Sequence, residues 1–160
     1  MASRLDYCNS IFYQISAANL QALQSVLNSA ARLSLSCGNG HHCNTIPVRD
    51  HLHWLPIRQR IMYKLCTIVY KCVHGAAPSY LAEMRIHVAA STGRRFLRSA
   101  SYGDLMVPWA RMSTYGQRRF AVSGPSVWND LPPTLRASST TFGQFQNKLK
   151  TVLFCSEDET

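Results

Sequence analysis

The chain has 160 residues, 46% of them hydrophobic, with 17 lysines and arginines against 8 aspartates and glutamates. This length and apolar content predict a folded chain with its own core and exclude a compositionally disordered one. Three acidic residues fall in the last four positions, so the rest of the chain carries 17 cations and five carboxylates. That balance favours a polyanionic partner, with nucleic acid preferred over an anionic membrane.

Apolar residues repeat at helical spacing through the first 35 positions. A short helix is predicted over residues 3–15, and Ser16 is expected to cap a second helix over residues 17–35. One narrow face of the second helix collects Leu20, Leu23, Leu27, Ala30 and Ala31. The alanines on this face would allow a neighbouring helix to approach closely.

Residues 37–45 form an expected loop that is rich in metal-ligand side chains. Cys37, His41 and Cys43 are ligand types for zinc, but their spacing matches no regular zinc knuckle or finger. The prediction is therefore no metal and no other cofactor, with these three residues as weak zinc candidates. Six cysteines without a secretory signal predict free thiols in a reducing compartment, either the nucleus or the cytoplasm.

The stretch from His53 to Gly75 predicts the central helix of the fold. Pro56 suits a first helical turn, and Gly75 suits the left-handed position that follows a helix. The apolar stripe between them consists of Ile57, Ile61, Leu65, Ile68 and Cys72. Basic side chains border this stripe and are predicted to contact a polyanion, namely Arg58, Arg60, Lys64 and Lys71.

The C-terminal half mixes short helices with basic loops. Pro78 is expected to begin a short helix, residues 91–103 an exposed basic loop, and residues 105–107 a short extended segment. Residues 115–131 predict two short helical turns broken at Gly124-Pro125.

A last helix is expected to follow a cap at Ser139 or Thr140. Its apolar stripe would consist of Phe142, Phe145, Leu149, Val152 and Leu153. The sequence therefore predicts a mainly α fold: a small helical domain with irregular basic loops and at most one short β element.

Arginines alternate with aromatic residues between positions 94 and 119. Guanidinium groups can hold phosphates while aromatic rings stack on exposed bases, so this pattern indicates nucleic-acid binding. The predicted phosphate-contacting residues of this region are Arg94, Arg95, Arg98, Arg111, Arg118 and Arg119. The alternative is that the rings of Trp109, Tyr115, Phe120 and Trp128 are core, which is the expectation for Trp128 in its proline-bounded corner.

Catalytic signals are weak. Outside the acidic tail, no aspartate is paired with another carboxylate at short spacing, as a two-metal polymerase or nuclease site requires. No Gly-x-Ser-x-Gly elbow, phosphate-binding glycine loop or membrane-spanning apolar stretch occurs in the sequence. The chain is therefore predicted to lack enzymatic activity of its own and to lie outside membranes.

Several motifs run in order from Leu5 to Phe154. They include Arg4-Leu5-Asp6-Tyr7-Cys8-Asn9-Ser10, His53-Trp54-Leu55-Pro56, Tyr70-Lys71-x-x-His74-Gly75-x-Ala77-Pro78, Thr114-Tyr115-Gly116-x-Arg118 and Pro125-x-x-Trp128-Asn129-x-Leu131-Pro132. Together they resemble the region downstream of the catalytic domain in LINE-type, non-LTR retrotransposon reverse transcriptases. The Cys37–Cys43 loop is richer in cysteine and histidine than this resemblance leads us to expect.

The resemblance implies the thumb and C-terminal extension of an endonuclease–reverse transcriptase polyprotein, whose catalytic aspartates lie upstream of this region. Residues 1–86 would form a thumb-like helical bundle, residues 87–155 an extension packed on it, and residues 156–160 an acidic disordered tail. The implied partners are an RNA–DNA or DNA duplex, element RNA, and the upstream polymerase domain. Two alternatives stay open, a structural remnant without binding activity and a zinc-stabilised interaction module.

Overall fold

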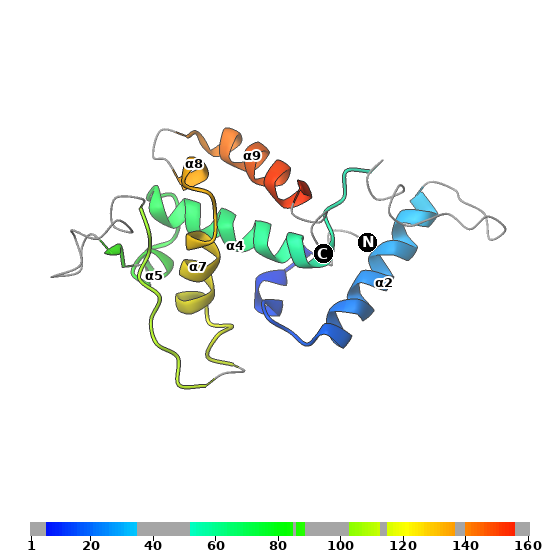
Figure 1. Ribbon diagram of the computed structural model, residues 1–160, viewed down its shortest axis with the longest axis horizontal. Coiled ribbons are helices and arrows are strands. Elements are labelled where there is room, and N and C mark those ends of the chain that lie inside the picture. The colour runs from blue at the N-terminus through cyan, green and yellow to red at the C-terminus, as the bar shows by residue number, and fades with distance from the viewer. Residues whose placement is uncertain are drawn as a thin grey trace. The chain divides into compact units, whose positions relative to one another are not determined.

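A computed structural model describes residues 6–34, 52–84, 86–88, 103–112, 115–136 and 140–155 (Figure 1). Over these ranges the fold is mainly helical, as predicted, and its β structure is a single antiparallel bridge between His87 and Leu105. The elements in chain order are the 3-10 helix η1 (Asn9–Phe12) and the α-helices α2 (Ala17–Ser34), α4 (Ile57–Val73), α5 (Ser79–Ala82), α7 (Phe120–Asn129), α8 (Pro133–Arg136) and α9 (Phe142–Cys155).

The chain divides into two compact units, Met1–Ile61 and Met62–Thr160, which are called unit 1 and unit 2 and are described separately. The predicted boundary between residues 86 and 87 falls inside unit 2. There the Met106 amide donates to the Ile86 carbonyl at 2.7 Å, and the Val88 amide donates to the Asp104 carbonyl at 3.1 Å. The first of these bonds joins residues on opposite sides of the predicted boundary, and the second joins two residues that follow it.

In unit 1 the first predicted helix is shorter than expected, while the second matches. Between residues 7 and 15 the chain forms only η1, because Cys8 (φ 51°) and Gln14 (φ 55°) adopt left-handed conformations that an α-helix cannot continue through. In α2 the Leu20 amide donates to the Ser16 carbonyl, and Leu27 is buried. The prediction over residues 17–35 is confirmed for residues 17–34, and residue 35 lies outside the described part of the chain.

The N-terminus of α4 is capped from α2. The helix begins at Ile57, one position after Pro56, and the Ile57 amide donates to Oε1 of Gln24 at 2.9 Å. Gln24 in turn donates to Oδ1 of Asn28 at 2.8 Å, which orients its amide. A side chain from a distant part of the sequence therefore accepts a hydrogen bond from an amide that has no partner inside the helix.

The C-terminus of α4 closes as predicted. Gly75 has a φ of 70°, the Ala76 amide donates to the Lys71 carbonyl at 2.8 Å, and the Gly75 amide donates to the Cys72 carbonyl at 3.4 Å. This pair of bonds is the Schellman arrangement, in which glycine avoids the Cβ penalty of a left-handed residue. The buried face of α4 consists of Ile57, Ile61, Leu65, Cys66, Val69, Tyr70 and Cys72, so Val69 takes the place expected of Ile68.

The core of unit 2 is built around aromatic rings. The Tyr70 ring on α4 lies 4.4 Å from that of Phe145 on α9, and the Phe145 ring lies 6.0 Å from that of Trp128 on α7, centroid to centroid. Trp128 is 1% exposed and Phe145 is fully buried. The hydroxyl of Tyr70 donates to the backbone carbonyl of Thr140, which ties α4 to the residues before α9.

The prediction of a break at Gly124-Pro125 is wrong, because α7 continues through Pro125. Proline removes one helical hydrogen bond. Val127 and Trp128 follow it and are buried, and burial of their apolar area stabilises the helical conformation. Gly124 also permits close packing, since a Cβ there would lie 3.1 Å from Cγ2 of Val69 on α4. Tertiary packing therefore overrides the local proline signal.

A capping box begins α9, one residue later than predicted. The Gln144 amide reaches Oγ1 of Thr141 at 3.5 Å, and the Thr141 amide donates to Oε1 of Gln144 at 3.2 Å. Phe145, Leu149 and Leu153 are buried, as the stripe predicted, and Phe142 and Val152 are partly buried.

Candidate nucleic-acid interface

The predicted cations of α4 differ in how the fold uses them. Arg58, Lys64 and Lys71 are exposed, whereas the Arg60 side chain is only 12% exposed. In unit 2, Nζ of Lys71 lies 5.3 Å from the centre of the Phe142 ring, within the range of a cation–π contact. The basic edge of the helix therefore does not consist of equivalent side chains.

Arg60 is held by three groups of unit 1. Its Nη1 donates to both carboxylate oxygens of Asp6 at 2.8 and 2.9 Å, and its Nε donates to the Leu55 carbonyl at 2.8 Å. Its guanidinium carbon also lies 5.7 Å from the centre of the Trp54 ring. These contacts join the residues before η1 to the first turn of α4, so Arg60 has a structural role in this fold.

A loop between residues 105 and 119 brings together the other described site residues. Its start is anchored to the C-terminal end of α7: the Leu105 amide donates to Oδ1 of Asn129 at 2.9 Å, and Nδ2 of Asn129 donates to the Leu105 carbonyl at 2.8 Å. The loop returns to the N-terminus of α7, where the Arg119 carbonyl accepts from the Val122 amide at 2.9 Å. Both ends of α7 therefore hold this loop, which we call the 105–119 loop.

Two further bonds fix the chain where it enters the loop. Nε1 of Trp128 donates to the Gly103 carbonyl at 3.3 Å. Arg136 on α8 donates to Oδ1 of Asp104. The Arg136 side chain is 7% exposed, and desolvation lowers the pKa of its guanidinium. The entry is thus built on a largely buried ion pair, which has a structural role.

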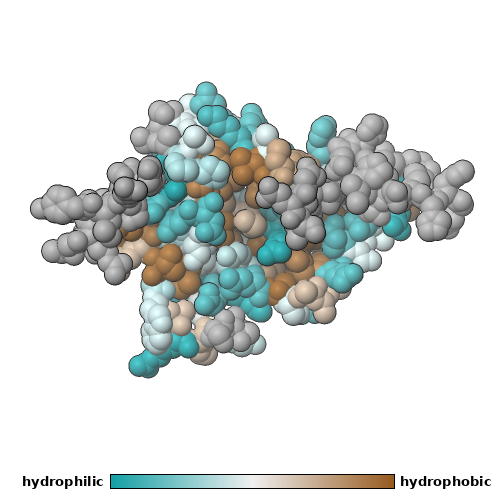
Figure 2. Space-filling model, in the orientation of Figure 1, coloured by the Kyte–Doolittle hydropathy of each residue, from teal (hydrophilic) through white to brown (hydrophobic). Residues whose placement is uncertain are grey.

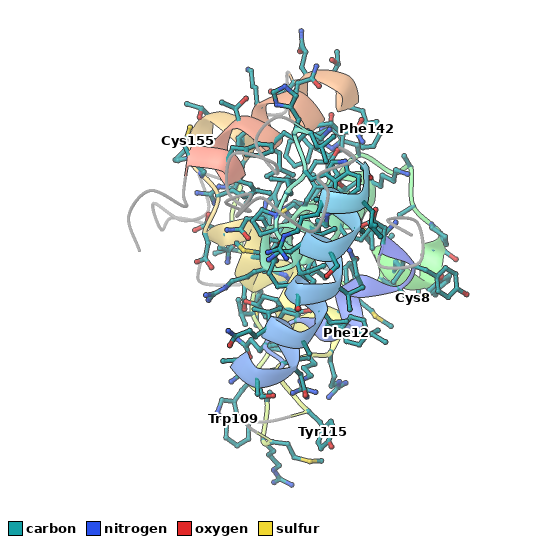
Figure 3. All side chains as sticks on the ribbon, turned by 90° about the vertical axis from the view of Figure 1, so that its right-hand side faces the viewer. Cys8, Phe12, Trp109, Tyr115, Phe142 and Cys155 are labelled. Carbon is teal, nitrogen blue, oxygen red and sulfur yellow. The ribbon has the colours of Figure 1, made fainter. Side chains whose placement is uncertain are left out.

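The tip of the 105–119 loop exposes large apolar side chains. Trp109 is 84% exposed, Tyr115 is 70% exposed and Met112 is 63% exposed. In Figure 1 the loop extends below α7, and Figure 3 shows the side chains of Trp109 and Tyr115 at that lower end. White, tan and teal surface adjoin at that end in Figure 2, so apolar and hydrophilic side chains share the tip.

Cations accompany these rings. Arg111 and Arg119 are exposed, and the guanidinium carbon of Arg118 lies 5.6 Å from the centre of the Tyr115 ring. Arg111, Arg118 and Arg119 therefore lie in one loop with Trp109 and Tyr115.

Gly116 closes the loop and was not recognised from the sequence. Its amide donates to the Met112 carbonyl at 3.1 Å, and a Cβ at Gly116 would lie 2.4 Å from that oxygen and 3.0 Å from Cβ of Ala110. A side chain at this position would force the backbone apart. The Tyr-Gly pair in the sequence is the signal that could have indicated a close backbone approach.

Other predicted site residues lie outside the described part of the chain. These are Arg94, Arg95 and Arg98, and the weak zinc candidates Cys37, His41 and Cys43. Among the described residues, no group of histidine, cysteine or carboxylate side chains could hold a metal ion. Within the same residues, no helix has the length and apolar character required to cross a bilayer.

The cysteines of α4 belong to the core. Cys66 and Cys72 are buried, and burial raises the pKa of the Cys66 thiol to about 12. A thiol in this environment stays protonated near neutral pH, and it is a poor nucleophile in that form.

Comparison with protein-family models, with curated proteins and with solved structures finds no match for this chain.

Proposed function

We propose that this chain is a non-catalytic, nucleic-acid-binding part of a LINE-type reverse transcriptase, which holds a template–primer duplex, element RNA or target DNA. The observation that carries the proposal is the charge of the exposed side chains of unit 2. Among its described residues, the exposed carboxylates are Glu83 and Asp130, and the exposed cations are Lys64, Lys71, Arg111, Arg119, Lys148 and Lys150. Such an imbalance attracts a polyanion through its phosphates.

The ion pairs of the fold support the same interpretation. Asp6 and Asp104 are engaged by Arg60 and Arg136, so these carboxylates hold the fold together. The motifs shared with LINE-type reverse transcriptases add that the chain acts beside an upstream polymerase domain, in the nucleus or cytoplasm.

The proposal is tested by binding of the full chain to a labelled RNA–DNA hybrid over a series of salt concentrations, measured by fluorescence anisotropy. The logarithm of the affinity is expected to fall linearly with the logarithm of salt concentration, with a slope of about −0.9 per phosphate contact. A flat dependence, or no binding at low salt, would contradict the proposal.

Matched double variants separate a local interface from general attraction. Arg111→Gln with Arg119→Gln, and Lys148→Gln with Lys150→Gln, each remove two exposed positive charges from unit 2. The arginine variant is expected to reduce the magnitude of the salt slope by about two and the lysine variant by less, because each lost phosphate contact removes about one unit. Equal reductions would show that the attraction is general and not local to Arg111 and Arg119.

A second candidate function rests on exposed apolar residues of unit 1. Ile11, Val26 and Leu33 are exposed, as expected if helices of a structural remnant once packed against another domain. Surface-dye binding and concentration-dependent self-association of the folded chain would support this candidate. Monomeric behaviour without dye binding would contradict it.

A further inference from the structure

We infer that the tip of the 105–119 loop binds unpaired nucleotides by stacking bases on Trp109 and Tyr115. This inference rests on the proposed function and adds to it the form of nucleic acid that the loop recognises. The phosphates would be held by the neighbouring arginines, whereas the rings would contact base faces, which a continuous duplex covers by its own stacking.

The two rings of the tip are exposed. Trp109 and Tyr115 present most of their surface to solvent, in the same unit in which Trp128 and Phe145 are buried. Exposed aromatic faces beside cations are what single-stranded nucleic acids use, because every base has a face that can stack and every nucleotide has a phosphate.

Hydrogen bonds hold the loop in one conformation. Asn129 fixes its start through two hydrogen bonds to the backbone of Leu105, and the Gly116 amide closes its tip on the Met112 carbonyl. Arg118 lies over the ring of Tyr115, which limits the orientations of that ring. A platform ordered before binding loses less conformational entropy when a base stacks on it.

The tip of the loop is positively charged. Arg111 is exposed between Trp109 and Met112, and Arg119 is exposed where the loop meets α7. Among the described residues of the loop itself, 105–112 and 115–119, the sequence has no carboxylate that would repel a phosphate. Rings and cations therefore alternate along the loop, as a strand with alternating bases and phosphates requires.

The test compares one labelled RNA of about 20 nucleotides, without self-complementarity, as a single strand and as a hybrid with complementary DNA. Trp109→Ala with Tyr115→Ala is expected to weaken single-strand binding by about tenfold or more, because a base–aromatic stack contributes roughly that factor. Hybrid binding is expected to stay within about twofold, since the phosphate contacts remain.

Three control variants accompany the double variant. Tyr80→Ala removes a tyrosine of unit 2 that is 61% exposed and lies on α5, outside the loop, and it is expected to leave both affinities unchanged. Trp109→Phe with Tyr115→Phe retains flat rings and is expected to restore most single-strand binding. Gly116→Ala keeps both rings but opens the loop, so it is expected to weaken single-strand binding selectively.

Tryptophan fluorescence supplies an independent readout. Stacking on Trp109 is expected to quench part of the tryptophan emission when the single strand is added. This quenching should disappear in Trp109→Phe, in which the emission of the other tryptophans should not change on addition of the single strand. No loss of quenching in this variant would overturn the inference.

The outcomes distinguish this inference from the proposed function. If the native chain binds neither form of nucleic acid at low salt, both fail. If it binds with the expected salt dependence but the double alanine variant loses no single-strand affinity, or loses both affinities equally, only the stacking inference fails. If the double variant instead loses binding to phosphatidylcholine–phosphatidylserine vesicles while its single-strand affinity is unchanged, the tip is a membrane contact and the inference is overturned.

Discussion

Trp109 and Trp128 belong to the same unit but lie in opposite environments. Trp128 is 1% exposed on α7, beside Phe145, and its Nε1 donates to the Gly103 carbonyl. Trp109 is 84% exposed at the tip of the 105–119 loop. The two regions are adjacent in sequence and joined by Asn129, yet one stabilises the fold and the other is available for a partner.

The contrast shows how one residue type serves two purposes. A buried indole stabilises the fold because it removes apolar area from water and fills space between helices. An exposed indole can instead bury its apolar area against a ligand. The core around Trp128 holds the ends of the loop, so the stability of the first region maintains the geometry of the second.

Replacing the buried ring should destabilise the protein far more than replacing the exposed one. Trp128→Ala is expected to lower the free energy of unfolding by about 3–5 kcal/mol, because it leaves a cavity beside Phe145. Trp109→Ala is expected to change it by less than about 0.5 kcal/mol. Urea denaturation followed by circular dichroism measures both, and similar losses would remove the distinction between the regions.

Alkaline pH should weaken the buried region through Cys66. Because burial raises the pKa of this thiol to about 12, the folded state holds its proton more tightly than the unfolded state does. The contribution is fully present below about pH 8.5 and is lost as pH rises toward 12, by about 1.4 kcal/mol per pH unit.

Urea denaturation at neutral pH and near pH 10 measures this effect. Cys66→Ala is expected to reduce the loss of stability at high pH, while Cys155→Ala, which alters an exposed thiol, retains it. An unchanged pH dependence in Cys66→Ala would contradict the prediction.

Two tyrosines repeat the contrast on a smaller scale. Tyr70→Phe removes the hydroxyl that donates to the Thr140 carbonyl in the core, and is expected to cost about 1–2 kcal/mol of unfolding free energy. Tyr115→Phe alters an exposed hydroxyl and should cost less than about 0.5 kcal/mol. Thermal denaturation of the two variants side by side tests the difference, and equal effects would show that the Thr140 bond contributes nothing.

Two arginines extend the comparison to charge. Arg60→Gln removes the hydrogen bonds to Asp6 and Leu55 and is expected to cost about 1 kcal/mol, a modest value because Asp6 is partly exposed to solvent. Its salt slope for the RNA–DNA hybrid should match that of the native chain. Arg111→Gln is expected to keep the stability and reduce the magnitude of the slope by about one. If Arg60→Gln instead reduced the slope and Arg111→Gln left it unchanged, the phosphate contact would belong to Arg60.

The sequence predicted much of the candidate site but not its organisation. Arg111, Arg118 and Arg119 were recognised because arginines recur beside aromatic residues. The sequence could not show that Gly116 closes the loop on the Met112 carbonyl, nor that Asn129 holds the start of the loop, because these contacts depend on how the backbone folds back. It also could not show that Arg60 forms an ion pair with Asp6, since the two residues are 54 positions apart in the sequence.

The sequence by itself determined the helices of residues 17–34, 57–73 and 142–155 and the excess of positive charge. Helical periodicity, caps and a terminating glycine act over a few residues, so they can be read locally. The burial of Trp128 was predicted from its proline-bounded corner, but only tertiary contacts set the continuation of α7 through Pro125 and the exposure of Trp109. Those outcomes depend on which distant side chains meet, because burial is set by neighbours in space and not by neighbours in sequence.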